Sequence, residues 1–293
     1  MDGSHPESPA RITAIKDRLA ATGLLKQLKL YESPIAVDEQ LERVHAHEYV
    51  QHIRRVAPHA GLVRLDGDTA MGPMTLAATL HQVGAVVQGV DLVMSGEVKN
   101  AFCCVRPPGH HAGYANSAGF CIFNGVAVGV AHAIAQYGIE RAAIIDFDVH
   151  HGDGTENIFK DNPKVMLCST FQHPFYPGRG ADTRTQRMVN VPLKEGTDGK
   201  GFRAAVESEF LPALTQFQPQ MVFVSAGFDA HRDDPLAGLG LVREDYIWVT
   251  QFILDIANRF AKDCVVSVLE GGYNLSALAD SAEAHVRVLA GLL

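Results

Sequence analysis

Four short, almost continuously apolar runs recur along the chain, separated by longer segments with the spacing of helices. The apolar runs are AFCCV (101–105), AAIIDFDV (142–149), MVFVSAG (221–227) and VVSVLE (265–270). Strands that are covered on both faces of a sheet have this continuous apolarity. Helices are expected over 74–95, 121–137, 200–217, 242–261 and 275–291. Near the start, Ser8-Pro9 before ARITAIKDRLA predicts a cap and a first-turn proline of one more helix.

The alternation of strands and helices predicts an α/β fold, built on an open, mostly parallel sheet with helices on both faces. No internal repeat and no low-complexity linker divides the 293 residues, so we expect a single domain over 1–293. In such sheets, ligands bind in the crevice beyond the carboxyl ends of the strands. The residues that follow each predicted strand are therefore the candidates for chemistry.

Histidine, carboxylate or tyrosine side chains follow all four predicted strands. They are His110 and His111 after the first run, Asp146, Asp148, His150 and Asp153 at the end of the second, Asp229 after the third, and Tyr273 after the fourth. Because the carboxyl ends of parallel strands meet at one edge of a sheet, we expect these side chains to form one site.

The segment IIDFDVHHGDG carries the strongest indication of a metal site. Side chains alternate along an extended segment, so Asp146, Asp148 and His150 share one side. Asp148 and His150 can bind one ion, and Asp229 is the best candidate for a third ligand. Two carboxylates and one imidazole with a free position are typical of a catalytic zinc site, and Fe(II) suits the same donors. The alternative is a polar turn that caps the next helix.

The adjacent His110 and His111 follow two prolines and a glycine, which restrict the loop that carries them. Two neighbouring histidines on a loop cannot easily both face the core, so at least one should point into the crevice. Each would need a carboxylate to fix its tautomer, and Asp146 and Asp153 are available. The alternatives are that the pair binds a metal itself or is solvated.

Tyr273 follows Gly271 and Gly272, which allow the backbone to approach the site closely. Its phenol would donate a hydrogen bond to the oxyanion that develops on an acyl carbonyl. The alternative is a tyrosine packed on the surface of a turn.

Charge and composition exclude several other classes of function. The chain has 25 Lys and Arg against 33 Asp and Glu, a formal net charge of −8, which argues against binding nucleic acid through phosphate contacts. The apolar runs are too short for a membrane span, and the N-terminus does not resemble a signal peptide. Five cysteines without CxxC spacing indicate reduced thiols and a cytoplasmic location.

Several motifs together resemble the zinc-dependent histone deacetylase family, in particular its bacterial class II-like members. The motifs are HPESPARI, RPPGHHAG, GFCIFN, DFDVHHGDGT, FYPGRGA, SAGFDAHRDDPL and LEGGYN, and they span nearly the whole chain. The resemblance implies the arginase-like open α/β fold, a zinc site and an amidohydrolase that removes acetyl groups from an amine.

Carried over to this chain, the resemblance implies a role for each polar residue of the site. It puts zinc on Asp148, His150 and Asp229. It makes His111, held by Asp153, the general base and later the general acid. His110, oriented by Asp146, would assist electrostatically, and Tyr273 would polarise the acyl carbonyl.

The resemblance also implies a substrate tunnel and potassium sites. Gly119, Phe120, Tyr176 and Gly271 would line the tunnel, Leu236 would lie at its rim, and Arg11 would line an inner pocket for acetate release. Potassium would be held by the side chains of Asp146 and Ser169 and by the carbonyls of Asp148, His150 and Thr170. A second potassium would take the carbonyls of Phe159, Asn162 and Val165.

The chain departs from the family pattern at a few places. Relatives usually have a first strand upstream of the first residues seen here, so that strand is expected to be missing. Tyr176 stands where many eukaryotic relatives have Phe, and Asp153 where many class II relatives have Asn. Relatives that prefer acetylpolyamines often carry an acidic group at the rim, so the apolar Leu236 favours acetyl-lysine.

The expected partner is an acetylated lysine or another small acetylated amine, such as an acetylpolyamine. Two other functions stay open. One is a binuclear manganese ureohydrolase on the related fold, and the other is a non-catalytic protein that binds acylated amines. The sequence gives no prediction of the oligomeric state.

Overall fold

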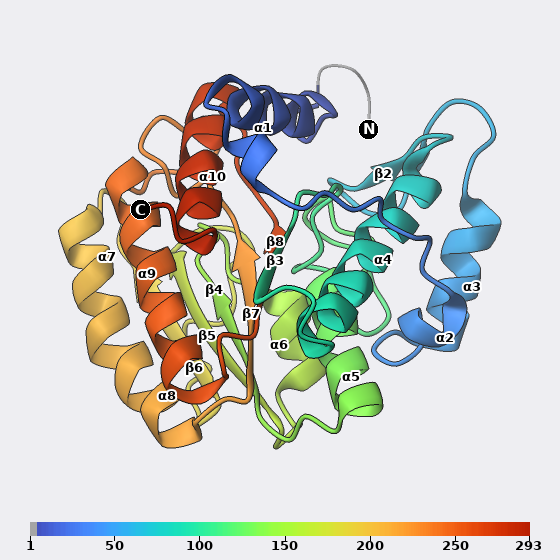
Figure 1. The fold of residues 1–293 in the computed structure, drawn as a ribbon. Helices are drawn as coiled ribbons and strands as arrows, with labels where there is room; N and C mark the ends of the chain where they lie inside the picture. The colour runs from blue at the N-terminus through green and yellow to red at the C-terminus, as the bar shows by residue number, and fades with distance from the viewer. Residues whose placement is uncertain (1–4) are drawn as a thin grey trace.

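The computed structural model describes residues 5–293, and its centre is one parallel sheet of six strands (Figure 1). The strands, in spatial order, are β3 (Asn100–Cys103), β8 (Val265–Leu269), β7 (Met221–Ala226), β4 (Ala142–Asp146), β5 (Val165–Gln172) and β6 (Met188–Leu193). All five neighbouring pairs run parallel. The predicted fold class, an open parallel sheet with helices, is therefore confirmed.

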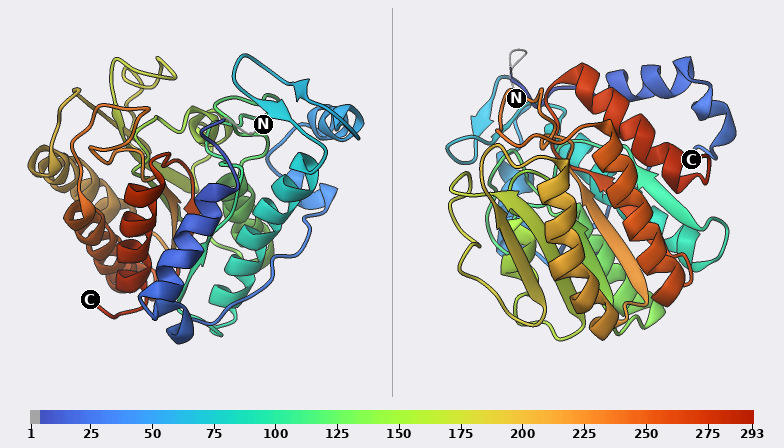
Figure 2. Two further views of the ribbon diagram at one scale, coloured as in Figure 1. Left: turned by 90° about the horizontal axis from the view of Figure 1, so that it is seen from above. Right: turned by 90° about the vertical axis from the view of Figure 1, so that its left-hand side faces the viewer.

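Helices cover both faces of this sheet (Figures 1 and 2). One face carries α1 (Ala10–Ala21), α9 (Arg243–Phe260), α10 (Leu275–Leu289) and the run α7 (Gly199–Ala205), η2 (Val206–Phe210) and α8 (Leu211–Phe217). The other face carries α4 (Thr75–Met94), α5 (Gly125–Tyr137) and α6 (Asp153–Phe159). Farther from the sheet lie η1 (Leu24–Gln27), α2 (Asp38–Leu41), α3 (His47–Val56) and the hairpin of β1 (Val63–Arg64) and β2 (Ala70–Met71).

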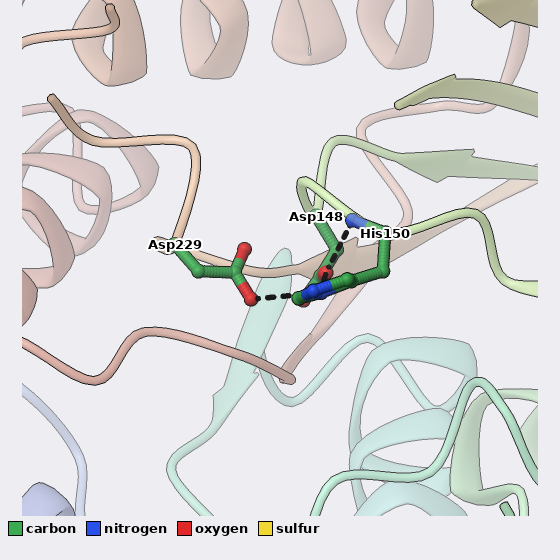
Figure 3. A group of neighbouring side chains, drawn as sticks. All are labelled: Asp148, His150 and Asp229. Carbon is green, nitrogen blue, oxygen red and sulfur yellow. Dashed lines mark hydrogen bonds and ion pairs between the residues drawn. The ribbon is translucent and has the colours of Figure 1, made fainter. Parts of the chain in front are cut away.

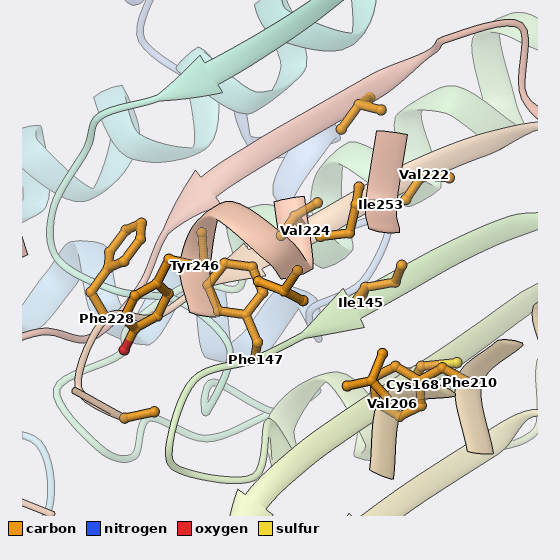
Figure 4. Packing of buried hydrophobic residues seen from close by; sticks show 14 of the residues in the cluster. Ile145, Phe147, Cys168, Val206, Phe210, Val222, Val224, Phe228, Tyr246 and Ile253 are labelled. Carbon is orange, nitrogen blue, oxygen red and sulfur yellow. The ribbon is translucent and has the colours of Figure 1, made fainter. Parts of the chain in front are cut away.

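Two apolar cores result from the alternation of side chains along the strands. Ile145 of β4 packs in the core beneath α9 and η2, whereas its neighbour Ile144 packs in the core beneath α4 and α5. Figure 4 shows the first core, where Tyr246 and Ile253 of α9 face Val224 of β7. Both faces of β4 are fully buried, which explains why its sequence is apolar without a break.

The sequence predicted four of the six strands, and β5 and β6 were missed. Strand β5 contains Ser169 and Thr170 in its centre, so it lacks a continuous apolar run although every residue in it is buried. Strand β6 contains Pro192, which has no N–H to donate, and it lies at the edge of the sheet where proline is tolerated.

Two details of the predicted helices were wrong. The helix expected over 200–217 is interrupted by the π-helical turn η2, which ends two residues before Pro212, whose missing N–H breaks the regular bonding pattern. The first helix begins at Ala10 with Pro9 as its cap residue, so Ser8 is not the cap.

By length and composition, α4 is one helix that could cross a membrane. It packs against α5 and β3, and 56% of its most apolar window is buried inside the protein. It therefore has the surroundings of a core helix.

Strand β3 forms one edge of the sheet within residues 5–293. An apolar groove of about 620 Å³ runs beside it, lined by residues of α1, α4 and α10. The strand that was predicted to be missing would lie upstream of residue 5, so this prediction concerns a part of the chain outside the described residues.

Candidate metal centre and active site

The polar residues singled out in the sequence meet at the carboxyl edge of four contiguous strands. His110 and His111 follow β3, Asp148 and His150 follow β4, and Asp229 follows β7. Tyr273 follows β8, which lies between β3 and β7. The strand order therefore brings together residues that are up to 163 positions apart in the chain.

Asp148, His150 and Asp229 form a group that could hold a metal ion, because one ligand atom from each lies within 4.8 Å of the others (Figure 3). His150 Nδ1 lies 3.0 Å from Asp148 Oδ1 and 3.3 Å from Asp229 Oδ2. Both carboxylates are buried. The predicted convergence of these three side chains is thus present in the structure.

Backbone N–H groups orient both carboxylates. The N–H of Val149 donates to Asp229 Oδ1 at 2.9 Å, and the N–H of Gly271 donates to Asp148 Oδ2 at 2.8 Å. Asp229 Oδ2 is buried and accepts no hydrogen bond from residues 5–293. A buried carboxylate oxygen left without a donor is costly, and a cation would satisfy it.

Gly271 is also required for space. A Cβ at this position would overlap the carboxylates of Asp229 and Asp148. The expectation that a glycine here permits close approach to the site is therefore borne out by the packing.

The Asp148–His150–Asp229 group stabilises a positive charge placed among its members. Burial disfavours the charged form of His150, but the carboxylates of Asp148 and Asp229 beside it outweigh this effect and raise the pKa of His150 to about 10. Burial also disfavours the charged Asp148, yet the neighbouring His110 and His150 hold its pKa well below the usual range. A divalent ion would supply the same compensation, so the donor set fits zinc or Fe(II).

Each histidine of the adjacent pair has its own carboxylate. His110 Nδ1 lies 2.9 Å from Asp146 Oδ2, and His111 Nδ1 lies 2.8 Å from Asp153 Oδ1. Both imidazoles are buried, so neither is a solvated loop histidine. The predicted pairing of each histidine with a carboxylate is therefore present.

The two histidines differ in charge. Burial opposes the protonation of His110, but Asp148, Asp146 and Glu270 outweigh it and raise the pKa of His110 well above its ordinary value. Burial and the charge of His110 lower the pKa of His111 to about 3. Near neutral pH, His111 is thus a neutral imidazole beside a charged one.

The histone deacetylase domain model matches residues 5–289, almost the whole chain. The chain belongs to the histone deacetylase family. The histone deacetylase-like amidohydrolase of Pseudomonas aeruginosa is 36% identical over 277 residues, which is 92% of this chain and 73% of that protein. The human polyamine deacetylase HDAC10 is 36% identical over 302 residues, 97% of this chain and 44% of that protein.

A solved structure agrees with this assignment. The crystal structure of the HDA15 HD domain superimposes with a TM-score of 0.91 at 32% identity, covering all of this chain and 85% of that one. The predicted resemblance to the histone deacetylase family is confirmed, and with it the deacetylase-like fold.

In this member of the histone deacetylase family, aromatic rings pack against the histidine and tyrosine side chains of the site. Tyr176 lies edge-on to His111, with 5.1 Å between the ring centroids, and Phe120 lies edge-on to Tyr273 at 5.9 Å. Phe120 has a positive φ of 68° directly after Gly119. A Cβ on Gly119 would overlap the ring of His111, so only glycine fits there.

Two other expected site residues lie nearby. Arg11 is fully buried, donates through Nε to the carbonyl of Gly272 at 2.7 Å, and stacks its guanidinium over the Tyr273 ring at 5.1 Å. Leu236 is half-buried on the loop that also carries Asp229. Its N–H donates to Asp234 Oδ1 at 2.9 Å.

The two side chains expected to bind potassium lie on neighbouring strands. Asp146 of β4 and Ser169 of β5 are register partners, and Thr170 follows directly. The carbonyls of Asn162 and Phe159 each accept a backbone hydrogen bond within the turn before β5, which leaves a second lone pair on each.

Four residues of the site were missed at the level of sequence. Phe175 stacks on His150 at 5.6 Å between centroids. His151 is fully buried between Ser169 and Glu156. The others are buried carboxylates, Asp234 and Glu270, that accept hydrogen bonds from backbone N–H groups of the loops carrying Tyr273 and His110. Their partners are backbone atoms, which leave no signature in a sequence.

Proposed function

We propose that the chain is a zinc-dependent deacetylase that hydrolyses the amide of an acetylated lysine or a similar aliphatic amine. The observation that carries the proposal is the position of His111, which is paired with Asp153 and whose ring centroid lies 5.9 Å from that of His150 in the Asp148–His150–Asp229 group. A zinc ion bound by the three would polarise a carbonyl and lower the pKa of a water molecule. Membership of the deacetylase family supports this reaction class.

His111 is the proposed general base. Its Nδ1 is engaged by Asp153, so Nε2 is the nitrogen left to take a proton from the attacking water and return it to the leaving amine. Its lowered pKa keeps it neutral near pH 7. His110, charged and paired with Asp146, would stabilise negative charge that develops nearby.

Tyr273 is the proposed oxyanion donor. It follows the same strand end as Gly271, whose N–H holds Asp148. Its pKa is raised well above the ordinary value by burial, so the phenol keeps its proton and can donate it in a hydrogen bond. The rings of Phe120 and Tyr176 would enclose the aliphatic stem of the substrate.

Acetylpolyamines are a second candidate substrate class. The 36% identity to a protein named polyamine deacetylase favours them, whereas the apolar Leu236 at the rim favours acetyl-lysine. Arg11 is proposed to line the pocket through which acetate leaves, since its guanidinium is buried and lies over the Tyr273 ring.

Acetate release tests the proposal. Zinc-loaded protein is expected to hydrolyse an acetyl-lysine peptide, acetylspermidine, or both, and a hydroxamate should block the reaction. The His111→Ala variant is the matched control, because it should retain zinc and lose turnover. Tight binding of acetyl-lysine without hydrolysis would favour a non-catalytic binder, and two manganese ions per chain would favour a ureohydrolase.

We extend the proposal to potassium. The side-by-side placement of Asp146 and Ser169 supports a site beneath the loop that follows β4, completed by the carbonyls of Asp148, His150 and Thr170. A second ion would use the carbonyls of Phe159, Asn162 and Val165. Activity and melting temperature should then be higher in potassium chloride than in the chloride of a bulky organic cation at equal ionic strength.

A further inference from the structure

In the loop between β3 and α5, the segment that leads into the two histidines has few backbone donors that can hold it in place. Pro107 and Pro108 have no N–H, so the next donors after them along the loop belong to Gly109 and His110. Both donate to one atom, Glu270 Oε2, at 2.6 and 3.1 Å. The carbonyl side of the same loop is held from α6, where the N–H of Thr155 donates to His110 O at 3.1 Å.

Among the residues that the structure describes, the Glu270 side chain forms hydrogen bonds with this loop alone. It follows β8, the strand that pairs with β3, and its side chain is fully buried. Its own N–H donates to Ala226 O at 3.0 Å, and its carbonyl accepts from Arg11, so its backbone is tied to the sheet and to α1. Within residues 5–293, its second carboxyl oxygen, Oε1, has no hydrogen-bond partner.

The two hydrogen bonds from Gly109 and His110 to Glu270, called the brace below, do not depend on the charge of the carboxyl group. Burial raises the pKa of Glu270 to about 7. A proton taken up near that pH can reside on Oε1, which leaves Oε2 as an acceptor for both N–H groups. The geometry therefore requires an acceptor oxygen at this point more than it requires an anion.

The loop has little room to move on its other side. A Cβ on Gly109 would lie 2.9 Å from the N of Gly125 and 3.0 Å from Phe123 O, so the loop packs tightly against the start of α5. Glu270 faces the loop from the side of the sheet. Loss of the brace would thus release the loop in one direction, with the two imidazoles on it.

We infer that Glu270 is a positioning residue, which acts on the reaction by holding the backbone of Gly109 and His110 and through it the imidazole of His111. The effect of Glu270 on turnover rests on the proposed function. Its effect on the loop rests on the hydrogen bonds alone. A displacement of about 1 Å in a catalytic group can cost roughly 100-fold in rate.

The test compares Glu270→Gln with Glu270→Ala in zinc-loaded protein. The Gln side chain keeps an oxygen at the Oε2 position and puts its NH₂ where Oε1 has no partner, so kcat should stay within about 3-fold of the wild type. The Ala variant should lose roughly 10- to 100-fold in kcat, with KM changed less than 3-fold and one zinc retained per chain.

Hydrogen exchange gives a readout that does not require activity. The amides of Gly109 and His110 should exchange slowly in the wild type and in the Gln variant, and much faster in the Ala variant. Glu283→Ala is the control for a general loss of stability, because Glu283 is a buried carboxylate of α10 that pairs with Arg243 and Arg287 away from the loop. It should leave the exchange at 109–110 and kcat unchanged.

The outcomes separate the two claims. Unchanged exchange and unchanged kcat in Glu270→Ala would overturn the positioning role, and so would a Gln variant as impaired as the Ala variant, since charge would then be the cause. A wild type without turnover, but with exchange that responds to Glu270 as described, would overturn the proposed function and leave the brace intact.

Discussion

The buried carboxylates of Asp148 and Asp229 lie beside each other and beside one imidazole, that of His150. Like charges removed from water repel each other strongly, so such a pair persists only with a compensating cation. Without a metal, the proton on His150 supplies that charge, as its raised pKa indicates. A divalent ion would take the place of this proton, and metal binding should therefore release protons and stabilise the folded state.

Gly271→Ala should abolish metal binding without unfolding the protein. The added Cβ would overlap the carboxylates of Asp229 and Asp148, whereas the strand before it is unchanged. Metal content after dialysis against zinc should fall from one per chain to near zero, with the far-ultraviolet circular dichroism spectrum retained. Gly67→Ala is the control, because nothing lies within 4 Å of a Cβ at that position. Full zinc occupancy in the Gly271 variant would contradict this account of the site.

Tyr273→Phe should lower kcat by roughly 100- to 1,000-fold, the usual effect of removing one oxyanion donor. KM and zinc content should change little, because the phenol would act in the transition state and does not belong to the metal group. Steady-state kinetics with an acetyl-lysine peptide measure both constants. A variant with wild-type kcat would show that Tyr273 has no part in the reaction.

The sequence predicted many of the individual residues that lie together in the site. Alternation along IIDFDVHHGDG and the position of Asp229 at another strand end were enough to predict that three candidate metal ligands lie together. Asp234 and Glu270 could not be predicted, because what they do depends on backbone N–H groups of loops that are distant in the chain. The residues alone offered Asp146 and Asp153 as available partners for the two histidines, and the family resemblance implied which carboxylate holds which histidine. The structure supplies the distances.

Helix α10 is tied to the sheet and to α9 by one buried polar residue. His285 is fully buried, and its ring nitrogens lie 2.7 Å from Thr250 Oγ1 of α9 and 2.8 Å from Ser267 Oγ of β8. Because Thr250 donates its own hydroxyl proton to Tyr246 O, His285 Nδ1 is the donor to Thr250. The imidazole therefore links three elements as a neutral group.

Protonation of His285 should contribute to acid destabilisation. Burial lowers the pKa of His285 to about 3, against 6.5 for the ordinary group. The unfolded chain then binds one more proton than the folded chain between those values, so stability present above pH 6.5 is lost as the pH falls. The free energy of unfolding, measured with urea at each pH, should rise with pH between pH 4 and 6. This rise should be about 1.4 kcal/mol per pH unit steeper in the wild type than in His285→Gln. Equal slopes would contradict a buried neutral histidine.

Elements were predictable where their apolar pattern was continuous. Strands β3, β4, β7 and β8 each contain a single polar residue, whereas β5 carries Ser169, Thr170 and Gln172 and β6 carries Pro192. The polar residues of β5 are tolerated because one of them, Ser169, pairs with His151. Such compensation comes from tertiary contacts, and a local pattern does not contain it.

The strand order of the whole molecule explains why one edge of the sheet carries the chemistry. β3, β8, β7 and β4 are contiguous, and each ends in a loop that supplies a residue to the site. The sequence predicted that these strands share a sheet, but their order depends on crossover connections that periodicity does not encode. The cytoplasmic location and the single domain over 1–293 stay predictions.

Titration of the metal-free protein with zinc, followed by acetate release from an acetyl-lysine peptide and from acetylspermidine, tests the central claim most directly. The rate should rise in proportion to added zinc and reach a plateau at one ion per chain, and the Asp229→Asn variant should show no such rise. Protein that holds one zinc per chain and releases no acetate from either substrate, or from a wider panel of acylated amines, would contradict the account.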